Sequence, residues 1–454
     1  GAGQSEATEI AKIVQKLDIV DKRDEAQPPE ALSKDSGDRK EKYQFGHAML
    51  PHFCLEKGYV NLNHGSYGSC PRPVFDSAQE MALKIESKPD YFFRIELFGY
   101  MKAVRESLAT FINASHIDEV VMVPNATHGI NVILHNLQLK EGDILIGFNT
   151  TYVAISSTLR RYADATPTPQ LQIITLAFPT TPEAIISTFR KHIEQNVKRT
   201  AGTRVVALID AIISNPGVLL PWEELVQICK ENRIVSVVDA AHAIGQIPLD
   251  MQRTDPDYLV SNCHKWLYTK RSSSILYTPK RNHQSMRWTF PISEGYTSPP
   301  NEVKFAEQYE WLGTIDYAPY LSVIPALQFR KELGGEDRIR SYCHGLAREG
   351  GSKMAEILGT ELMDKDDKFT ANMVDVLLPL SEEEIKILPS NVPGIIHTRL
   401  LENWHCMSAV YKHNGKIWTR ASAQIWIEVS DFEYVARALA TICKDLVQEA
   451  TGSQ

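Results

Sequence analysis

Hydrophobic residues in the middle of the chain come in short runs that alternate with amphipathic segments. Continuous apolar runs at 119–123, 144–148, 204–209 and 235–238 are typical of buried strands. Between two of these strands, apolar residues recur with helical spacing over residues 222–231. Strands that alternate with helices in this way predict an α/β fold with an open, mostly parallel sheet.

The pattern changes at both ends of this region. Residues 1–45 hold one short segment with helical spacing, Ile10 to Leu17, followed by a charged, Pro-containing stretch, and we expect a tail or linker. Residues 46–64 are expected to join a small domain, residues 65–315 to form a large domain, and residues 316–454 to complete the small α/β domain. The last part is predicted to contain three strands and a final helix, at 373–377, 418–421, 424–428 and 431–448.

Composition narrows the possible partners and location. With 454 residues, a net charge of -8 and 43% hydrophobic residues, the chain is typical of a soluble globular protein that binds neither nucleic acid nor an anionic membrane. The seven cysteines are scattered and form no C-x-x-C pair, so we expect neither a disulfide framework nor a metal site. There is no apolar run of membrane-spanning length and no signal-peptide pattern, so a cytoplasmic location is expected.

A lysine follows one of the predicted strands. The apolar run Tyr258–Val260 ends in a polar turn that carries His264 and Lys265 side by side. Burial disfavours a charged amine, and a neutral amine is what a Schiff base needs. A lysine taken alone is far more often an ordinary solvated loop residue, so the role of Lys265 depends on the residues that accompany it.

Two turns have the composition of ligand-binding loops. Residues 125–129 join a strand to a helix, and Ala126 and Thr127 stand where backbone N–H groups and a hydroxyl bind phosphate. A second turn follows a short strand near residue 60 and contains a glycine that allows close backbone approach. Its candidate substrate-binding residues are Asn63, His64, Gly65 and Ser66.

Further polar side chains follow other predicted strands. Tyr152 comes after the strand at 144–148 and is suited to stacking on a flat ring. Asp210 and Asp239 end the two strands of a βαβ unit, and His242 follows three residues after Asp239. Because ligands bind at the carboxyl edge of open parallel sheets, we expect these side chains to share a site.

Together these residues fit pyridoxal 5′-phosphate (PLP). A PLP enzyme needs a phosphate cup, a ring-stacking side chain, an Asp beside the pyridine nitrogen, a donor to the ring hydroxyl and a lysine for the internal aldimine. The chain offers them in order as Ala126-Thr127, Tyr152, Asp239, His242 and Lys265. Asp239 would keep the pyridine nitrogen protonated, so that the ring accepts electrons from the substrate's α-carbon.

The motifs resemble those of class V aminotransferases, in the branch of isopenicillin N epimerase-like and cysteine desulfurase-like proteins. The similar segments are residues 59–68, 125–129, 239–242 and 261–265. The resemblance covers roughly residues 50–450. It implies the fold of the aspartate aminotransferase superfamily, fold type I, with a large, mostly parallel sheet domain and a small C-terminal α/β domain.

The resemblance also implies individual roles. Ser261 and His264 would contact the cofactor phosphate. Thr314 would be lent to the phosphate of a neighbouring subunit, which implies a homodimer. Arg420 would hold the α-carboxylate of an amino-acid substrate through a bidentate pair. The predicted catalytic residues are Lys265, His264 and Tyr152. The predicted cofactor-binding residues are Ala126, Thr127, Tyr152, Asp210, Asp239, His242, Ser261, His264, Lys265 and Thr314.

Two members of this branch carry similar segments, the PLP enzyme of loline-alkaloid biosynthesis and the fungal ergothioneine-pathway C–S lyase. The lyase pattern has a cysteine three residues after the stacking Tyr, where this chain has Ile155. The only candidate acceptor thiol near the small domain is Cys406. The resemblance therefore favours a lyase or cyclase of specialised, alkaloid-type metabolism that acts at the α-carbon through a quinonoid carbanion. The alternatives are a C–S lyase or cysteine desulfurase-like enzyme, and an amino-acid epimerase or aminotransferase.

Overall fold

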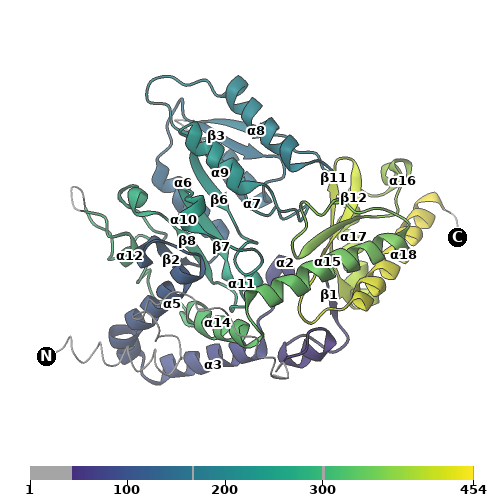
Figure 1. Ribbon diagram of the computed structural model, residues 1–454, viewed down its shortest axis with the longest axis horizontal. Helices are drawn as coiled ribbons and strands as arrows, with labels where there is room; N and C mark the ends of the chain where they lie inside the picture. The colour runs from purple at the N-terminus through teal and green to yellow at the C-terminus, as the bar shows by residue number, and fades with distance from the viewer. Residues whose placement is uncertain (1–42, 166–167, 299–301, 453–454) are drawn as a thin grey trace, which may run out of the picture.

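The computed structural model describes residues 43–165, 168–298 and 302–452, in two α/β regions that lie side by side (Figure 1). Residues 1–42 of the expected tail, which include its short helical segment, lie outside the described part of the chain. The larger region is built on a seven-stranded sheet in which only β8 is antiparallel to its neighbours. In spatial order its strands are β2 (Val120–Val123), β8 (Ser274–Tyr277), β7 (Tyr258–Asn262), β6 (Val235–Asp239), β5 (Val205–Asp210), β3 (Ile144–Phe148) and β4 (Gln170–Ile174).

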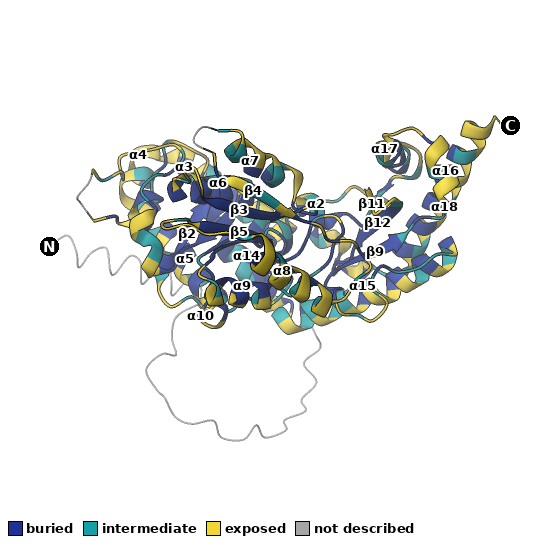
Figure 2. Ribbon diagram, turned by 90° about the horizontal axis from the view of Figure 1, so that it is seen from above, coloured by how far each residue is buried: buried dark blue, intermediate teal, exposed yellow. Residues whose placement is uncertain are grey.

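Helices cover both faces of this sheet, which explains why its strands, apart from the edge strand β4, are mostly apolar and buried. In β5, Val205, Ala207 and Ile209 face one core cluster, while Val206 and Leu208 face another. Apart from the edge strand β4, the strands are buried between helices whose outer faces are exposed (Figure 2). The helices on one side are α6 (Ala126–Leu137) and α7 (Val153–Ala163), and those on the other include α5 (Leu97–Phe111), α8 (Pro182–Asn196) and α9 (Trp222–Glu231).

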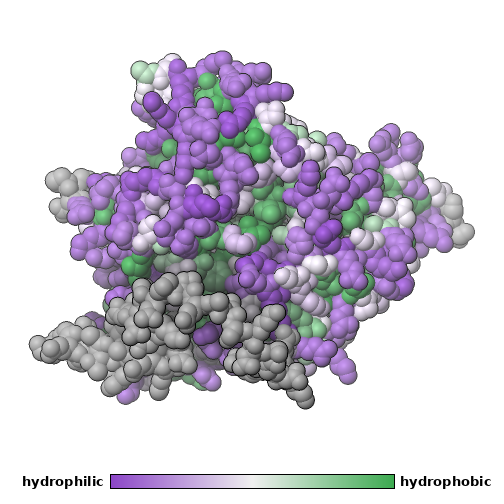
Figure 3. Space-filling view, viewed as in Figure 1, coloured by the Kyte–Doolittle hydropathy of each residue, from purple (hydrophilic) through white to green (hydrophobic). Residues whose placement is uncertain are grey.

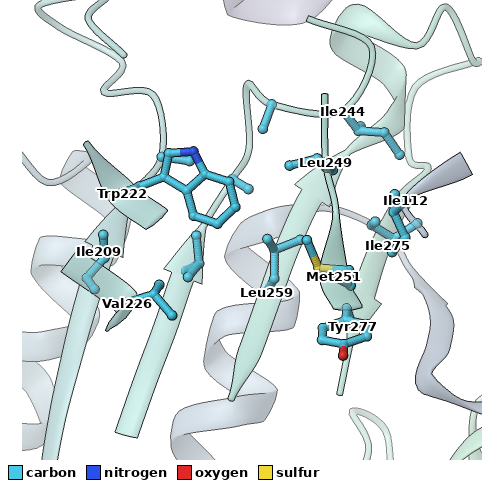
Figure 4. Packing of buried hydrophobic residues seen from close by; sticks show 14 of the residues in the cluster. Ile112, Ile209, Trp222, Val226, Ile244, Leu249, Met251, Leu259, Ile275 and Tyr277 are labelled. Carbon is cyan, nitrogen blue, oxygen red and sulfur yellow. The ribbon is translucent and has the colours of Figure 1, made fainter. Parts of the chain in front are cut away.

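The core below the sheet is close-packed. Trp222 and Val226 of α9 lie against Ile209 of β5, and Leu259 of β7 lies beside Met251 (Figure 4). All five side chains are at most 3% exposed. This packing fixes the strand positions, and therefore the residues at the strand ends. The predicted mostly parallel α/β sheet is confirmed.

The smaller region contains a three-stranded antiparallel sheet and two long helices. The strands are β11 (Ala409–His413), β12 (Lys416–Ser422) and β9 (Met373–Leu377), and the long helices are α15 (Glu336–Leu358) and α18 (Val429–Thr451). α17 (Val392–Trp404) packs against α18 and β11. The sequence analysis did not predict β11 or α17. In β11 only the three residues Ala409–Tyr411 are buried, whereas in α17 the buried residues Val392, Ile396 and Leu400 do recur at helical spacing.

The predicted strand at 424–428 is wrong. Residues 423–428 form a turn that leads into α18. Ile425, Trp426 and Ile427 are buried, which explains the strand-like composition. Their partners are not strands: the N–H of Gly46 donates to the carbonyl of Ile425, and the ring of Trp426 packs on Phe53 at 4.1 Å between centroids.

Both ends of the chain contribute to the smaller region. β1 (Val60–Asn61) pairs with β10 (Cys406–Met407), and the backbone N–H of His47 donates to Glu428 at 2.7 Å. Tyr43, inside the stretch expected to be a tail, is buried against Phe329.

Residues 317–324 pack with the large-region core, although they lie beyond its expected boundary at residue 315. They include α13 (Ala318–Leu321), which contacts α3 (Arg72–Ser87) and α5.

Hydrophilic residues dominate the face of the molecule seen in Figure 3, and apolar residues gather mostly toward its middle. Among the residues that the structure describes, no helix is both long enough and apolar enough to cross a lipid bilayer.

Candidate active site

Parallel strands bring the predicted polar residues to one edge of the large sheet. Asp210 ends β5 and Asp239 ends β6, and the two are paired in register. β7 ends at Asn262 and continues into the one-turn helix α11 (Cys263–Trp266), which carries Lys265. A cavity of about 350 Å³ lies at this edge. The predicted residues that line it are Ser66, Ala126, Thr127, Tyr152, Asp210, Asp239, His242, His264 and Lys265.

Lys265 lies at the centre of this constellation. Its Nζ is 3.2 Å from Nε2 of His242. Burial, and then the positive charge of Arg420, lower the pKa of Lys265 to about 7, while Asp239 opposes the shift. An amine with this pKa is largely neutral just above pH 7, as nucleophilic attack on an aldehyde requires.

The protonation of His242 follows from its second neighbour, Trp266. The indole Nε1 of Trp266 lies 3.3 Å from Nδ1 of His242. Indole can only donate, so Nδ1 must accept and the imidazole proton must lie on Nε2. Burial and the nearby Lys265 hold the pKa of His242 well below its usual range, so the ring is neutral. The Nε2–H group of His242 therefore donates a hydrogen bond to the neutral amine of Lys265.

Asp210 and Asp239 form a buried pair of carboxyl groups. Burial, and then the charge of Asp239, raise the pKa of Asp210 well above its usual range. Burial also raises the pKa of Asp239, although its Oδ1 accepts the backbone N–H of Ala241 at 3.0 Å. Two such groups cannot both ionise cheaply without a cation. A protonated pyridine nitrogen beside Asp239 would supply that cation.

The start of α6 forms an anion cup. The side chain of Asn125 caps the helix by accepting the N–H of His128 at 2.8 Å, and Ala126 N–H donates to Oδ1 of Asn262 at 2.9 Å. Thr127 stands in the first turn, where helices leave N–H groups without an intrahelical partner. His264 lines the same end, and Nδ1–H of its ring donates to the carbonyl of Ser273 at 2.9 Å. Burial lowers the pKa of His264 to about 4.

Arg420 lies behind the cavity wall and is not among the residues that line the cavity. It is 1% exposed, and its guanidinium donates to Ser214 O at 2.6 Å, Ser66 Oγ at 2.9 Å and Asn63 Oδ1 at 3.0 Å. Its Nε bonds to no described residue. The main chain at Gly217 lies so close that a Cβ there would be 2.7 Å from Cδ of Arg420. The wall residues Ser66 and Ser214 thus separate the guanidinium from the cavity.

Three of the predicted residues are not among those that line this cavity. Ser261 is fully buried on the other face of β7, because neighbouring strand residues point to opposite faces. Its hydroxyl accepts the N–H of Ile244 at 3.0 Å and donates to Ala240 O. His64 is also buried, and its Nε2 donates to the carbonyl of Lys265 at 2.7 Å. Gly65 packs against the small region, where its N–H donates to Ser422 Oγ at 3.1 Å.

Thr314 also lies outside this cavity. Its side chain is exposed, in the segment between α12 (Phe305–Gln308) and α13. Its lending to a neighbouring subunit stays a prediction.

Several lining residues were not predicted from the sequence. Asn262 takes the place expected for Ser261, because it is the next residue of β7 and points to the cavity. Its signal was available in the alternation of that strand. Asn125, Ala241 and Tyr67 adjoin residues that were predicted. The others come from a loop whose composition carried no distinct signal, and they are Ile212, Ser214 and Asn215.

The residues present fit PLP. The buried carboxyl of Asp239 faces the cavity, where Lys265 is the one cation beside it among the lining residues. The start of α6 and His264 suit a phosphate, and Tyr152 is 45% exposed at the cavity wall.

The fold agrees with solved PLP-type enzymes. It is similar to a mutant of C-DES with glycine covalently linked to the PLP cofactor (TM-score 0.71, 16% identity, 85% of this chain and 97% of that one). It is also similar to an apo cysteine desulfurase of Thermococcus onnurineus NA1 (TM-score 0.69, 17% identity, 89% of this chain and 100% of that one). The molecule therefore has the fold of PLP-dependent enzymes of fold type I.

Sequence comparison then gives the family. The profile of class V aminotransferases matches residues 69–384, and the chain belongs to this family. One relative is the L-cysteine desulfhydrase-like protein lolT1 of Epichloe uncinata, 32% identical over 90% of this chain and 98% of that one. Another is hercynylcysteine sulfoxide lyase of Schizosaccharomyces pombe, 29% identical over 88% of this chain and 98% of that one. Isopenicillin N epimerase of Streptomyces clavuligerus is 25% identical over 85% of this chain and 95% of that one.

Proposed function

We propose that this protein is a lyase or cyclase of specialised, alkaloid-type metabolism that removes a proton from the α-carbon of an amino acid. The observation that carries the proposal is the near-neutral amine of Lys265, which faces the cavity between His242 and Asp239. When bound, PLP supplies an aldehyde that condenses with amines and a ring that accepts an electron pair. A base with a pKa near 7 is suited to moving a proton at neutral pH.

Arg420 is proposed to hold the substrate's α-carboxylate. Ser66 and Asn63 occupy its NH2 group in the structure, and both belong to the turn that precedes and opens α2 (His64–Tyr67). A carboxylate in their place would gain a charge-assisted, bidentate contact, which neutral oxygens cannot match. Binding would then require the α2 turn to shift relative to β12.

The cavity offers no acceptor for sulfur. No cysteine is among the described residues that line it. Cys406 is fully buried in β10, and burial raises its pKa to about 12, so it is not a thiolate at neutral pH. These observations argue against persulfide transfer of the cysteine desulfurase kind.

The second candidate function is cleavage of a C–S bond without a thiol acceptor. It is supported by the names of two relatives, an L-cysteine desulfhydrase-like protein and a hercynylcysteine sulfoxide lyase. Both candidates begin with removal of the α-proton, so Lys265 and Asp239 serve them alike. They differ in the bond that the released electrons break or form next.

The test is to incubate the PLP-loaded enzyme in D₂O with candidate amino acids, including L-cysteine and cysteine-conjugate sulfoxides. We expect exchange of the α-proton by NMR, at a rate that depends on Lys265. Pyruvate release from a sulfur substrate would establish C–S cleavage instead of the alkaloid-type reaction. Exchange with inversion, or transfer of the amino group, would indicate an epimerase or an aminotransferase. If no amino acid exchanges its α-proton, the proposal is wrong.

The Trp266→Phe variant should reveal the role of the indole donor. Without the Nε1–H bond to Nδ1, protonation of His242 is no longer opposed at that atom, so its pKa should rise toward the usual value. We expect the acidic limb of the pH–rate profile to move to higher pH, because His242 becomes protonated at a higher pH than in the unmodified enzyme. In that charged form its Nε2–H and Nδ1–H both donate. Loss of activity with an unchanged pH profile would show that Trp266 only packs.

We also propose that the protein is a homodimer in which Thr314 completes the phosphate cup of the partner. The exposed position of Thr314, away from its own cavity, supports this arrangement. Sedimentation should give a dimer, and a mixture of Lys265→Ala and Thr314→Ala protomers should recover one intact site per mixed dimer. Monomeric, fully active protein would contradict it.

A further inference from the structure

A second cavity lies at the opposite, amino-terminal edge of the large sheet. It has a volume of about 320 Å³. Asp143 and Arg204 line it, and each directly precedes a strand, β3 and β5. Asp210 ends β5 at the other edge, so the six residues of the strand separate the two cavities by roughly 20 Å. The second cavity is therefore distinct from the candidate active site.

Three cations line this second cavity without a carboxylate partner. They are Lys140, Arg204 and Arg287. Within the described ranges none of them forms an ion pair, and NH1 of Arg287 is buried with no hydrogen bond. By contrast, Arg281 on the preceding 3-10 helix (Lys280–Ser285) pairs with Asp255 and Asp257. Arg287 is partly buried, while Lys140 and Arg204 are exposed. Together they give the cavity a positive charge that would attract an anion in a protein of net charge -8.

The one acidic residue of the cavity holds the backbone in place. Asp143 is 1% exposed, and its two oxygens accept the backbone N–H groups of Lys140 at 3.0 Å and Arg204 at 2.9 Å. It therefore draws the two basic residues together, while its oxygens are engaged by the main chain. The side chain of Arg204 additionally donates to Leu137 O at the end of α6.

The position of the third cation is fixed in a similar way. Nδ2 of Asn136 donates to the carbonyl of Trp288, and the N–H of Trp288 donates back to Oδ1, both at 2.8 Å. Asn136 is 5% exposed. This two-way bond anchors the residue next to Arg287. The backbone positions from which the basic side chains extend are therefore fixed before an anion binds.

We propose that this cavity binds a small multivalent oxyanion, a phosphate-bearing or polycarboxylate metabolite. Guanidinium groups match the paired oxygens of phosphates and carboxylates, and the lysine adds a further charge. The volume accommodates a molecule of several heavy atoms beyond a single phosphate. The proposal concerns binding at this edge of the sheet and does not depend on the reaction at the other edge.

The experiment is calorimetric titration of the full-length, PLP-loaded protein with pyrophosphate and, separately, with citrate, in a buffer free of both. We expect saturable binding of at least one probe, with a dissociation constant that rises about tenfold or more in Arg287→Gln, because a charge-assisted contact is lost. Lys140→Gln should weaken binding in the same direction. Binding of pyrophosphate alone would identify a phosphate ligand, and binding of citrate alone a carboxylate.

Two control variants test whether the anion binds in this second cavity. Arg281→Gln removes a nearby guanidinium that is already paired, and should leave the affinity unchanged. Thr127→Ala alters the cofactor's phosphate cup and should also leave it unchanged. Absence of saturable binding, an equal loss in Arg281→Gln, or a loss in Thr127→Ala would overturn the proposal. Thermal unfolding without ligand verifies that each variant is folded.

Discussion

Lys265→Ala is expected to yield a folded protein that no longer holds PLP covalently and has lost its activity. The amine is both the group that bonds the cofactor and the proposed base at the α-carbon. Loss of the base alone should reduce turnover by roughly 10²–10⁴-fold. The visible absorbance of the bound cofactor should disappear, and borohydride treatment of the unmodified enzyme should fix the cofactor on the peptide that contains Lys265.

Lys270→Ala is the matched control. Lys270 lies five residues away, and its amine is bonded only to the exposed Gln79 at 3.4 Å. This variant should keep both the absorbance and the activity. If Lys265→Ala retained a borohydride-fixed cofactor, or if Lys270→Ala lost it, the assignment of the Schiff-base lysine would be wrong.

Asp239→Asn is expected to have the second-largest effect. The carboxyl is buried at the end of β6, where the pyridine nitrogen of the cofactor would provide its counter-charge. Removing one partner of a buried ion pair costs about 3–5 kcal/mol. We therefore expect cofactor affinity and turnover to fall by roughly 10²–10⁴-fold, measured by fluorescence titration with PLP and by the α-proton exchange assay.

Asp210→Asn separates this role from simple burial. Burial and the neighbouring Asp239 raise the pKa of Asp210 well above its usual range, which favours the protonated carboxyl, and an amide resembles that form in shape and charge. Thr151 Oγ1, 3.2 Å from Oδ2 of Asp210, retains a partner in the variant. The affinity for PLP should change by less than about tenfold. If Asp210→Asn weakened PLP binding as much as Asp239→Asn does, the two carboxyl groups would share a single negative charge.

The large sheet was predictable because most of its strands are apolar on both faces, and the strands β2, β3, β4 and β5 are each followed by a long amphipathic helix. The order of Asp239, His242 and Lys265 along the chain was also informative, since parallel strands deliver their carboxyl ends to one edge. The smaller region was harder to predict. Its buried turn at 424–428 has the composition of a strand, and only the contacts of Phe53 and Gly46, distant in sequence, show that it is not one.

Within the site, sequence order located residues but not the direction of their side chains. Ser261 and Asn262 are neighbours, and only the register of β7 decides which of them faces the cavity. His64 looked like a ligand-binding residue, yet the aromatic rings of Trp266 and Trp426 enclose it, at 4.9 and 5.3 Å between centroids. Such outcomes depend on tertiary contacts that a motif does not encode.

The contact between the two ends of the chain has a consequence for synthesis on the ribosome. The N–H of His47 and its partner Glu428 are 381 residues apart, and β1 has no strand partner until β10 has been made. At roughly 5–20 residues per second, the amino-terminal segment waits tens of seconds for the strands and helices that bury it. Phe53 and Leu62, buried in the native state, lack their small-region partners during that time. A nascent chain that stalls before β10 should therefore be a substrate for chaperones that recognise apolar segments.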